Sequence, residues 1–142
     1  MRRWGTGSSA DLFAIDAKGG ITIVEVKVSK ADLRGDGKWP DYLDYCDRFF
    51  WAVPQGFDLS PFEEPGFRPD IILADYHLDA GESGLTAVNR LRKAQGVPIH
   101  AVVITADHSR EVAEAVASAS CEILRKPVKP AELRALITHL VA

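Results

Sequence analysis

The chain has 142 residues, of which 46% are hydrophobic and 26% are charged, and its net charge at pH 7 is -3. This length allows one domain with a hydrophobic core and is short for two ordinary domains. The acidic balance argues against nucleic-acid affinity through bulk charge, although it leaves a local basic patch open. Two cysteines without metal-ligand spacing, and the lack of an apolar signal or membrane-length run, predict a cytoplasmic protein with no membrane segment.

The first elements form a predicted hairpin. The apolar run 10–15 and the β-branched run 21–28 predict two strands, and the turn sequence at 18–20 joins them. Ser29 is a predicted N-cap for the helix that follows.

The next segment is less regular. Gly35 and Gly37 interrupt the helix, and Pro40 predicts its restart, with an end at Arg48. The apolar run 49–53 predicts a buried strand. The segment 55–69, rich in Pro, Gly and acidic residues, predicts a loop.

From residue 71 onward, strands and helices alternate. Strands are predicted over 71–76, 101–105 and 122–124, and helices over 84–94, 109–119 and 130–141. Ser109 and Pro130 are expected near the starts of the last two helices. This alternation predicts a parallel sheet covered on both faces.

The predicted fold class is α/β, a single three-layer domain with a mainly parallel, flavodoxin-like sheet plus an N-terminal β-hairpin strand. The predicted strand order is 49–53, 21–28, 71–76, 101–105 and 122–124. A strand has only two edges, so the hairpin competes with 71–76 for one edge of 21–28. The hairpin could open, the order could change, or two chains could swap a strand or segment in a homodimer.

The first candidate site combines Asp11, Glu25 and Lys27. Glu25 and Lys27 point to the same face of their strand, and the hairpin brings Asp11 close. Two carboxylates can hold a hard divalent cation, and a lysine can stabilise charge on a phosphate. A solvated ion pair on a strand is the alternative interpretation.

Around this site, the sequences EVK (25–27) and KWPDYLDYCDRFFWAVP (38–54) resemble the MmcB-like family of DNA-repair proteins, in the PD-(D/E)XK nuclease superfamily. The resemblance covers roughly residues 3 to 67. It implies Asp11 and Glu25 as ligands of Mg²⁺ or Mn²⁺, Lys27 as the catalytic lysine and DNA as a partner. The family's leading helix, most of its first strand and its C-terminal part are missing.

The same resemblance makes Lys38 a weaker candidate for phosphate contact. Trp39, Tyr42 and Tyr45 are candidates for stacking on bases, with packing against the sheet as the alternative.

The second candidate site combines Asp75, Thr105 and Lys126, each at the end of a predicted strand. Open parallel sheets place ligand sites at the carboxyl ends of their strands. A carboxylate nucleophile, a hydroxyl and an ammonium group suit acyl-phosphate formation. Polar residues that merely cap strands are the alternative.

The sequences RPDIILADYHLDAGESGLTAVNRLRKA, AVVITADHS and CEILRKPVKPAELRALITHL resemble the later half of response-regulator receiver domains, especially those of hybrid histidine kinases. The resemblance covers 68–142. It implies Asp75 as phosphoacceptor, Thr105 and Lys126 as phosphate contacts, and a histidine kinase or phosphotransfer protein as partner. Receivers also carry an acidic pair that holds Mg²⁺, and no such pair is recognisable before Asp75.

The sequence therefore predicts a chimera of a nuclease-like segment, 1–67, and a receiver-like half domain, 68–142, which together form one composite domain. Its origin, by design, laboratory recombination or natural fusion, stays open. Three functions follow: a metal-dependent DNA-repair nuclease, a phosphoacceptor domain of a phosphorelay, and a folded chimera without activity.

Overall fold

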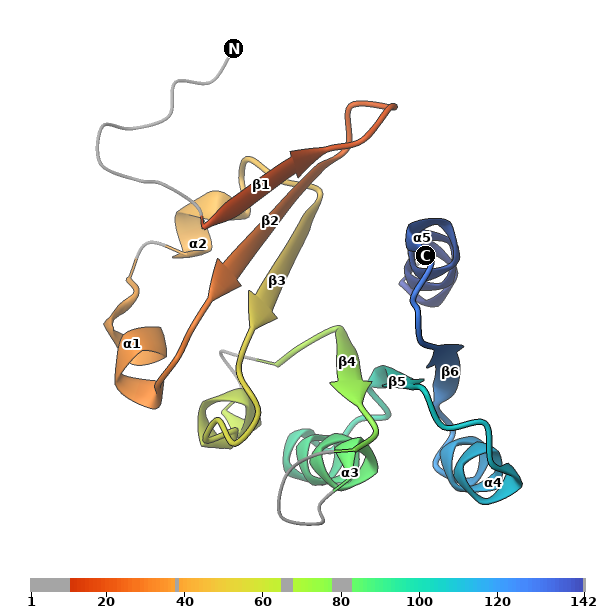
Figure 1. The fold of residues 1–142 in the computed structure, drawn as a ribbon. Helices are drawn as coiled ribbons and strands as arrows, with labels where there is room; N and C mark the ends of the chain where they lie inside the picture. Colours follow the sequence, from red (N-terminus) through yellow and green to blue (C-terminus); the bar gives the residue numbers. More distant parts are fainter. Residues whose placement is uncertain (1–10, 38, 65–67, 78–82, 142) are drawn as a thin grey trace. The chain divides into compact units, whose positions relative to one another are not determined.

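The computed structural model describes residues 11–37, 39–64, 68–77 and 83–141. The chain divides into two compact units, residues 1–58 and 59–142, here named the N-terminal and C-terminal units. Each contains its own three-stranded sheet (Figure 1). The Lys38 prediction lies outside the described residues.

The N-terminal unit has the strand order β1-β2-β3. Its elements are β1 (Leu12–Ile15), β2 (Ile21–Val26), α1 (Lys30–Gly35), α2 (Trp39–Tyr42) and β3 (Arg48–Ala52). β1 pairs with β2 antiparallel, and β2 pairs with β3 parallel. The predicted hairpin and the N-cap at Ser29, whose hydroxyl accepts the Asp32 N–H at 3.1 Å, are confirmed.

Asp16 shapes the hairpin turn. Its carboxylate accepts the backbone N–H groups of Lys18 and Gly20, both at 2.8 Å. Gly19 has φ of +83°, a conformation that favours glycine over residues with a side chain. These local bonds fix the pairing of Ile15 with Ile21, and so the register of the hairpin.

The two faces of β2 differ in burial. Ile23, Glu25 and Lys27 are buried, whereas Val26 and Val28 on the opposite face are largely exposed. On this face, Tyr42 of α2 packs near Phe49, which pairs with Ile23, and Asp36 at the end of α1 contacts Lys27. Two charged side chains therefore share a face with the core of this unit.

The C-terminal unit has the strand order β4-β5-β6, all parallel. Its elements are the 3-10 helix η1 (Ser60–Glu63), β4 (Ile71–Asp75), α3 (Gly84–Gln95), β5 (His100–Thr105), α4 (Arg110–Ser118), β6 (Glu122–Arg125) and α5 (Pro130–Leu140). Figure 1 shows α3 and α4 on one side of this sheet and α5 on the other. The predicted Ser109 N-cap is confirmed, since its hydroxyl accepts the Val112 N–H at 3.3 Å.

Apolar side chains and one arginine hold this unit together. Val103 of β5 packs with Val112 and Val116 of α4 in a buried cluster. Arg92 of α3 donates to the carbonyl oxygens of Ile99, Ala119 and Ser120. These bonds tie α3 to the residue before β5 and to the residues after α4. Because the three strands are parallel, their carboxyl ends lie at one edge of the sheet.

The mixed α/β class with parallel strands is confirmed, but the predicted strand order is wrong. Both edges of β2 are taken, by β1 and by β3, so 71–76 does not pair with it. The pairing of β1 with β2 is favoured over a pairing of 71–76 with β2 because a short turn joins β1 to β2. Closing so short a loop costs little conformational entropy. Both edges of β2 are paired within one chain, so this pairing does not require a strand swap between two chains.

Three smaller corrections concern single elements. The helix predicted to reach Arg48 ends at Tyr42. The Asp47 N–H donates to the Ile21 carbonyl at 2.8 Å, and the Asp47 carboxylate accepts the Ile21 N–H at 2.7 Å, so that the chain is already bound to β2 just before β3 begins. β3 is half-buried along its length instead of fully buried. The predicted loop 55–69 contains η1.

Within the described ranges, no helix combines the length and the hydrophobicity that a membrane crossing requires.

Gly84, the first residue of α3, is expected to be intolerant of a side chain. A Cβ placed there would lie 2.1 Å from the backbone oxygen of Asp75. We expect Gly84→Ala to lower the free energy of unfolding by about 1–3 kcal/mol, because β4 and α3 must move apart. Chemical denaturation measures this. Gly35→Ala in α1, where nothing lies within 4 Å, is the control and should change stability by less than about 1 kcal/mol.

Candidate functional sites

Asp11 and Glu25 interlock at one end of the β1–β2 hairpin. The Asp11 N–H donates to Oε1 of Glu25 at 3.3 Å, and Oδ2 of Asp11 accepts the Val26 N–H at 2.9 Å. Glu25 is 4% exposed, whereas Asp11 is exposed. The structure thus places the two residues that the sequence proposed as metal ligands beside each other.

Lys27 completes this group. Its Nζ lies 3.6 Å from Oε2 of Glu25 and 2.9 Å from Oδ2 of Asp36. The ammonium also lies 5.9 Å from the ring centre of Trp51, within the range of a cation–π contact. The alternative of a solvated pair is therefore wrong, because the side chains of Lys27, Glu25 and Asp36 are all nearly buried.

Burial and neighbouring charges shift two of these groups. The pKa of Glu25 lies above its ordinary value, because burial raises it more than the Asp11 N–H lowers it, and the Asp11 charge adds to the rise. Burial lowers the pKa of Lys27, but the hydrogen bond and charge of Asp36 outweigh it, so that this pKa lies above its usual range. Glu25 is therefore harder to ionise than an ordinary glutamate, and Lys27 holds its proton more tightly than an ordinary lysine.

The donor chemistry here fits Mg²⁺ or Mn²⁺. The ligand atoms are carboxylate oxygens, the type that hard divalent cations prefer. In the described part of the chain, no group of three or more His, Cys, Asp or Glu side chains could hold a metal ion. Mg²⁺ is commonly bound by one or two carboxylates together with water and substrate phosphate, so a pair of the type of Asp11 and Glu25 is compatible with that ion.

The aromatic residues of α2 pack in the core of this unit. The Trp39 ring lies 5.5 Å from that of Trp51 and 6.0 Å from that of Phe49, between ring centres. Tyr42 is buried and stacks near Phe49 at 6.4 Å. Packing against the sheet, the alternative interpretation, is therefore confirmed for Trp39 and Tyr42, and the burial of Tyr42 leaves its ring no face for a base. Tyr45 is half-buried.

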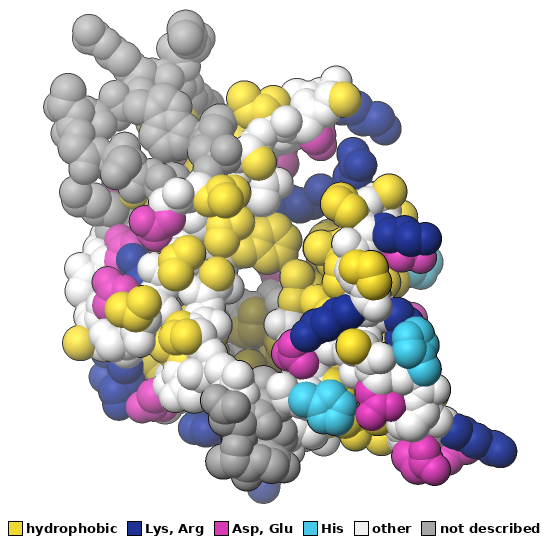
Figure 2. Space-filling model, viewed as in Figure 1, with side chains coloured by type: hydrophobic (Ala, Val, Ile, Leu, Met, Phe, Trp, Pro, Cys, Tyr) yellow, Lys and Arg dark blue, Asp and Glu magenta, His cyan; other side chains and the backbone are white. Residues whose placement is uncertain are grey.

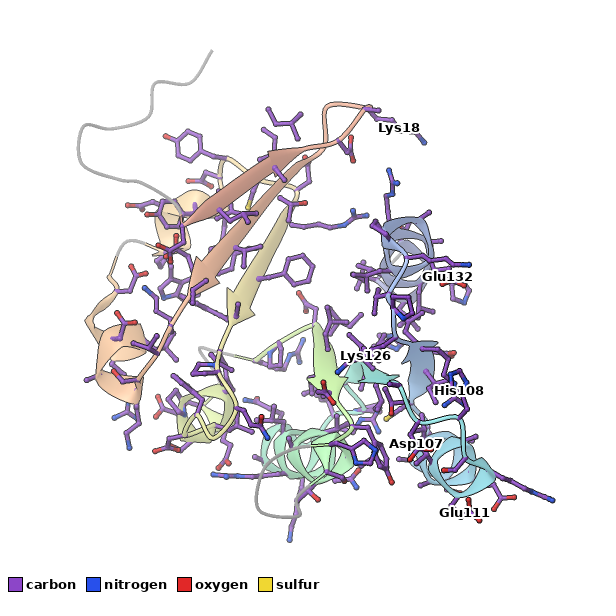
Figure 3. All side chains as sticks on the ribbon, in the orientation of Figure 1. Lys18, Asp107, His108, Glu111, Lys126 and Glu132 are labelled. Carbon is purple, nitrogen blue, oxygen red and sulfur yellow. The ribbon has the colours of Figure 1, made fainter. Side chains whose placement is uncertain are left out.

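The second group lies at the carboxyl ends of β4, β5 and β6. Lys126 Nζ forms an ion pair with Oδ2 of Asp75, and both side chains are partly exposed. Figure 3 labels Lys126. Thr105 ends β5, is 1% exposed, and its hydroxyl accepts the Asp107 N–H at 3.0 Å. The Lys126 N–H donates to the Thr105 carbonyl at 2.9 Å, so the three strand ends are adjacent as expected.

Two further residues, His77 and Asp107, lie at this edge and were missed. The His77 N–H donates to Oδ1 of Asp75 at 3.1 Å, and its ring Nε2 lies 3.5 Å from Oδ2 of Asp107. The backbone and side chain of Ser109, followed by His77, hold the pKa of Asp107 below its ordinary value. Each follows a predicted site residue by two positions, which is the sequence signal that could have located it.

Comparison with known proteins bears on the N-terminal unit first. The chain matches the profile of the family described as "DNA repair protein MmcB-like" over residues 3–118. The chain belongs to this MmcB-like family. The match extends beyond the 3–67 expected from the sequence and includes most of the receiver-like half. No match was found among curated proteins.

Solved structures are similar to this MmcB-like protein in two ways. A protein of unknown function from Silicibacter pomeroyi, SPO1766, is 41% identical over 39% of this chain, with a TM-score of 0.37. Only 38% of that protein is covered, well under two thirds of its length.

The other similar structures are receiver domains. A signal receiver domain of a putative Luxo repressor from Vibrio parahaemolyticus has a TM-score of 0.56 and 19% identity, covering 83% of this chain and 88% of that one. The N-terminal domain of the nisin resistance regulator NsrR has a TM-score of 0.54 and 20% identity, covering 82% and 97%. At this identity they show the flavodoxin-like α/β fold alone. Together, the family match and these neighbours agree with a chain that combines MmcB-like and receiver-like features.

Proposed function

We propose that the N-terminal unit of this MmcB-like protein is a metal-dependent phosphodiesterase that acts on DNA during repair in the cytoplasm. The observation that carries the proposal is the buried ion pair between Lys27 and Glu25, interlocked with Asp11. Burying charge is costly unless the charges are paired, and such groups concentrate at functional sites.

Each residue has a distinct role in this proposal. Asp11 and Glu25 would hold Mg²⁺ or Mn²⁺, which supplies a Lewis acid for the phosphate oxygens. The Lys27 ammonium stabilises negative charge that develops on the phosphate, and its neighbours hold it in place before the substrate arrives. Asp11 is exposed, which leaves this side of the site open to a DNA backbone.

Charge on the rest of the molecule fits a short contact with DNA better than a long one. Both basic and acidic side chains of the described residues are visible in Figure 2, and the net charge of the chain is -3 at pH 7. We therefore propose that DNA binding depends on the bound divalent cation and on contacts with a few phosphates. The affinity for DNA should then fall only slowly as the salt concentration rises.

The test is cleavage of linear and nicked DNA duplexes in Mg²⁺ or Mn²⁺. We expect the protein to cleave DNA and a chelator to abolish this cleavage. Lys27→Met keeps the apolar part of the side chain but removes its charge, and should cleave about 100-fold more slowly than the wild type. Lys18→Met, at the exposed hairpin turn, is the matched control and should cleave at the wild-type rate. Cleavage that persists in the chelator, or equal rates for both variants, would refute the proposal.

A second candidate function belongs to the C-terminal unit. We propose a phosphoacceptor role for Asp75 towards a histidine kinase or phosphotransfer protein. The Asp75–Lys126 ion pair supports it, because an ammonium beside the acceptor carboxylate can bind phosphoryl oxygens. The buried Thr105 hydroxyl at the adjacent strand end is a further potential donor.

A further inference from the structure

Asp36 was not among the residues that the sequence singled out, yet it contacts the catalytic lysine of the proposed site more closely than Glu25 does. Its Oδ2 lies 2.9 Å from Lys27 Nζ, compared with 3.6 Å for Oε2 of Glu25. The Asp36 side chain is 12% exposed, so that water screens this pair only weakly.

The backbone around Asp36 fixes the position of its carboxylate. Asp36 is the C-cap of α1, and its N–H donates to the Leu33 carbonyl at 3.3 Å. Its other carboxylate oxygen, Oδ1, accepts the Trp39 N–H at 3.2 Å, at the start of α2. One carboxylate thus joins the end of one helix, the start of the next, and the ammonium of Lys27.

These contacts leave Lys27 little freedom. A lysine side chain has four rotatable carbon–carbon bonds and would otherwise sample many rotamers. Asp36 holds its tip from the helix side, Glu25 lies on the strand side, and the Trp51 ring lies 5.9 Å away. An ammonium held in this way needs no reorganisation when a phosphate arrives.

We infer that Asp36 is a positioning residue of the phosphodiesterase site, which holds the Lys27 ammonium beside Glu25 in the geometry needed to contact a DNA phosphate. The inference rests on the proposed function of the N-terminal unit. It assigns Asp36 no contact with the metal or with DNA. Loss of the residue should therefore impair turnover and leave binding intact.

Asp36→Asn is the informative variant, because the amide oxygen can still accept the Trp39 N–H while the NH₂ group cannot accept from Lys27. We expect kcat for metal-dependent cleavage to fall by about 10- to 100-fold, with KM for DNA and the affinity for Mn²⁺ changed by less than about twofold. Asp41→Asn, which removes the same charge from the exposed first turn of α2, should leave all three values unchanged.

A double variant separates positioning from a general structural effect. If Asp36 acts through Lys27, Asp36→Asn combined with Lys27→Met should be no slower than Lys27→Met alone. Additive losses, or a raised KM with unchanged kcat, would overturn the inference. So would wild-type kinetics for Asp36→Asn.

A measurement that does not depend on cleavage distinguishes this inference from the proposed function. We expect the Lys27 ammonium of the wild type to give a proton–nitrogen NMR signal, because its protons are hydrogen-bonded and shielded from water. The signal should disappear in Asp36→Asn and persist in Asp41→Asn. If the wild type does not cleave DNA but the signal behaves in this way, the proposed function fails and the positioning of Lys27 stands. A signal unchanged in Asp36→Asn overturns the positioning itself.

Discussion

Replacing Glu25 by glutamine should reduce metal-dependent DNA cleavage by roughly 1,000-fold and, at neutral pH, make the protein more stable. The first effect follows because glutamine lacks the charge that would hold the cation. The second follows from the pKa of Glu25, which burial raises above its ordinary value of 4.5. The ionised carboxylate is therefore a cost to the folded state that glutamine does not carry.

The sign of the pH dependence is fixed by this shift. A group whose pKa is higher in the folded than in the unfolded state binds its proton more tightly when folded. Glu25 therefore lowers stability progressively as the pH rises from about 4.5 through its raised folded pKa, and the full cost is present above that value. The stability advantage of Glu25→Gln should be largest at pH 7 to 8 and vanish below pH 4.5.

Thermal unfolding across this pH range, together with Mn²⁺ titration and cleavage assays, tests both effects. Glu122→Gln, on the exposed side of β6, is the control for loss of one negative charge and should cleave as the wild type does. Undiminished Mn²⁺ affinity in Glu25→Gln would show that Glu25 is not a ligand. A variant that is less stable than the wild type at pH 8 would contradict the account of its burial.

The features that the sequence predicted correctly are those that local chemistry decides. The hairpin depends on one turn, with Asp16 and Gly19 close in sequence, and the N-caps depend on Ser29 and Ser109 acting within three residues. The proximity of Glu25 and Lys27 follows from the period of a strand, and that of Asp11 follows from the hairpin register.

The strand order could not be predicted because it depends on competition between elements distant in sequence. Both β1 and 71–76 were candidates for the same edge of β2, and only the hydrogen bonds of the folded chain show that β1 takes it. Asp47 likewise binds Ile21, 26 residues away, just before β3 begins. Asp36 was missed because its contact with Lys27 depends on where the end of α1 lies relative to β2, which the local sequence pattern does not specify.

Phosphorylation of Asp75 should be at least about 100-fold slower than in a receiver that carries the full acidic pair. The Asp75 carboxylate, the Lys126 ammonium and the Thr105 strand end are in place, so that nucleophile and cation are both present. A bound divalent cation contributes several kcal/mol of charge stabilisation at such sites, and a loss of about 3 kcal/mol is more than a 100-fold loss in rate.

Incubation with acetyl phosphate and Mg²⁺, followed by intact-mass measurement, tests this directly. We expect only slow conversion to the singly phosphorylated mass, and none in Asp75→Asn. Glu111→Gln, which removes one negative charge from the exposed first turn of α4, is the control and should behave as the wild type. Rapid and complete phosphorylation that depends on Asp75 would show that Lys126 and the strand ends suffice without the acidic pair. The phosphoacceptor role would then be the better supported of the two proposed functions, because Asp75 would have reacted at a site formed by the C-terminal unit alone.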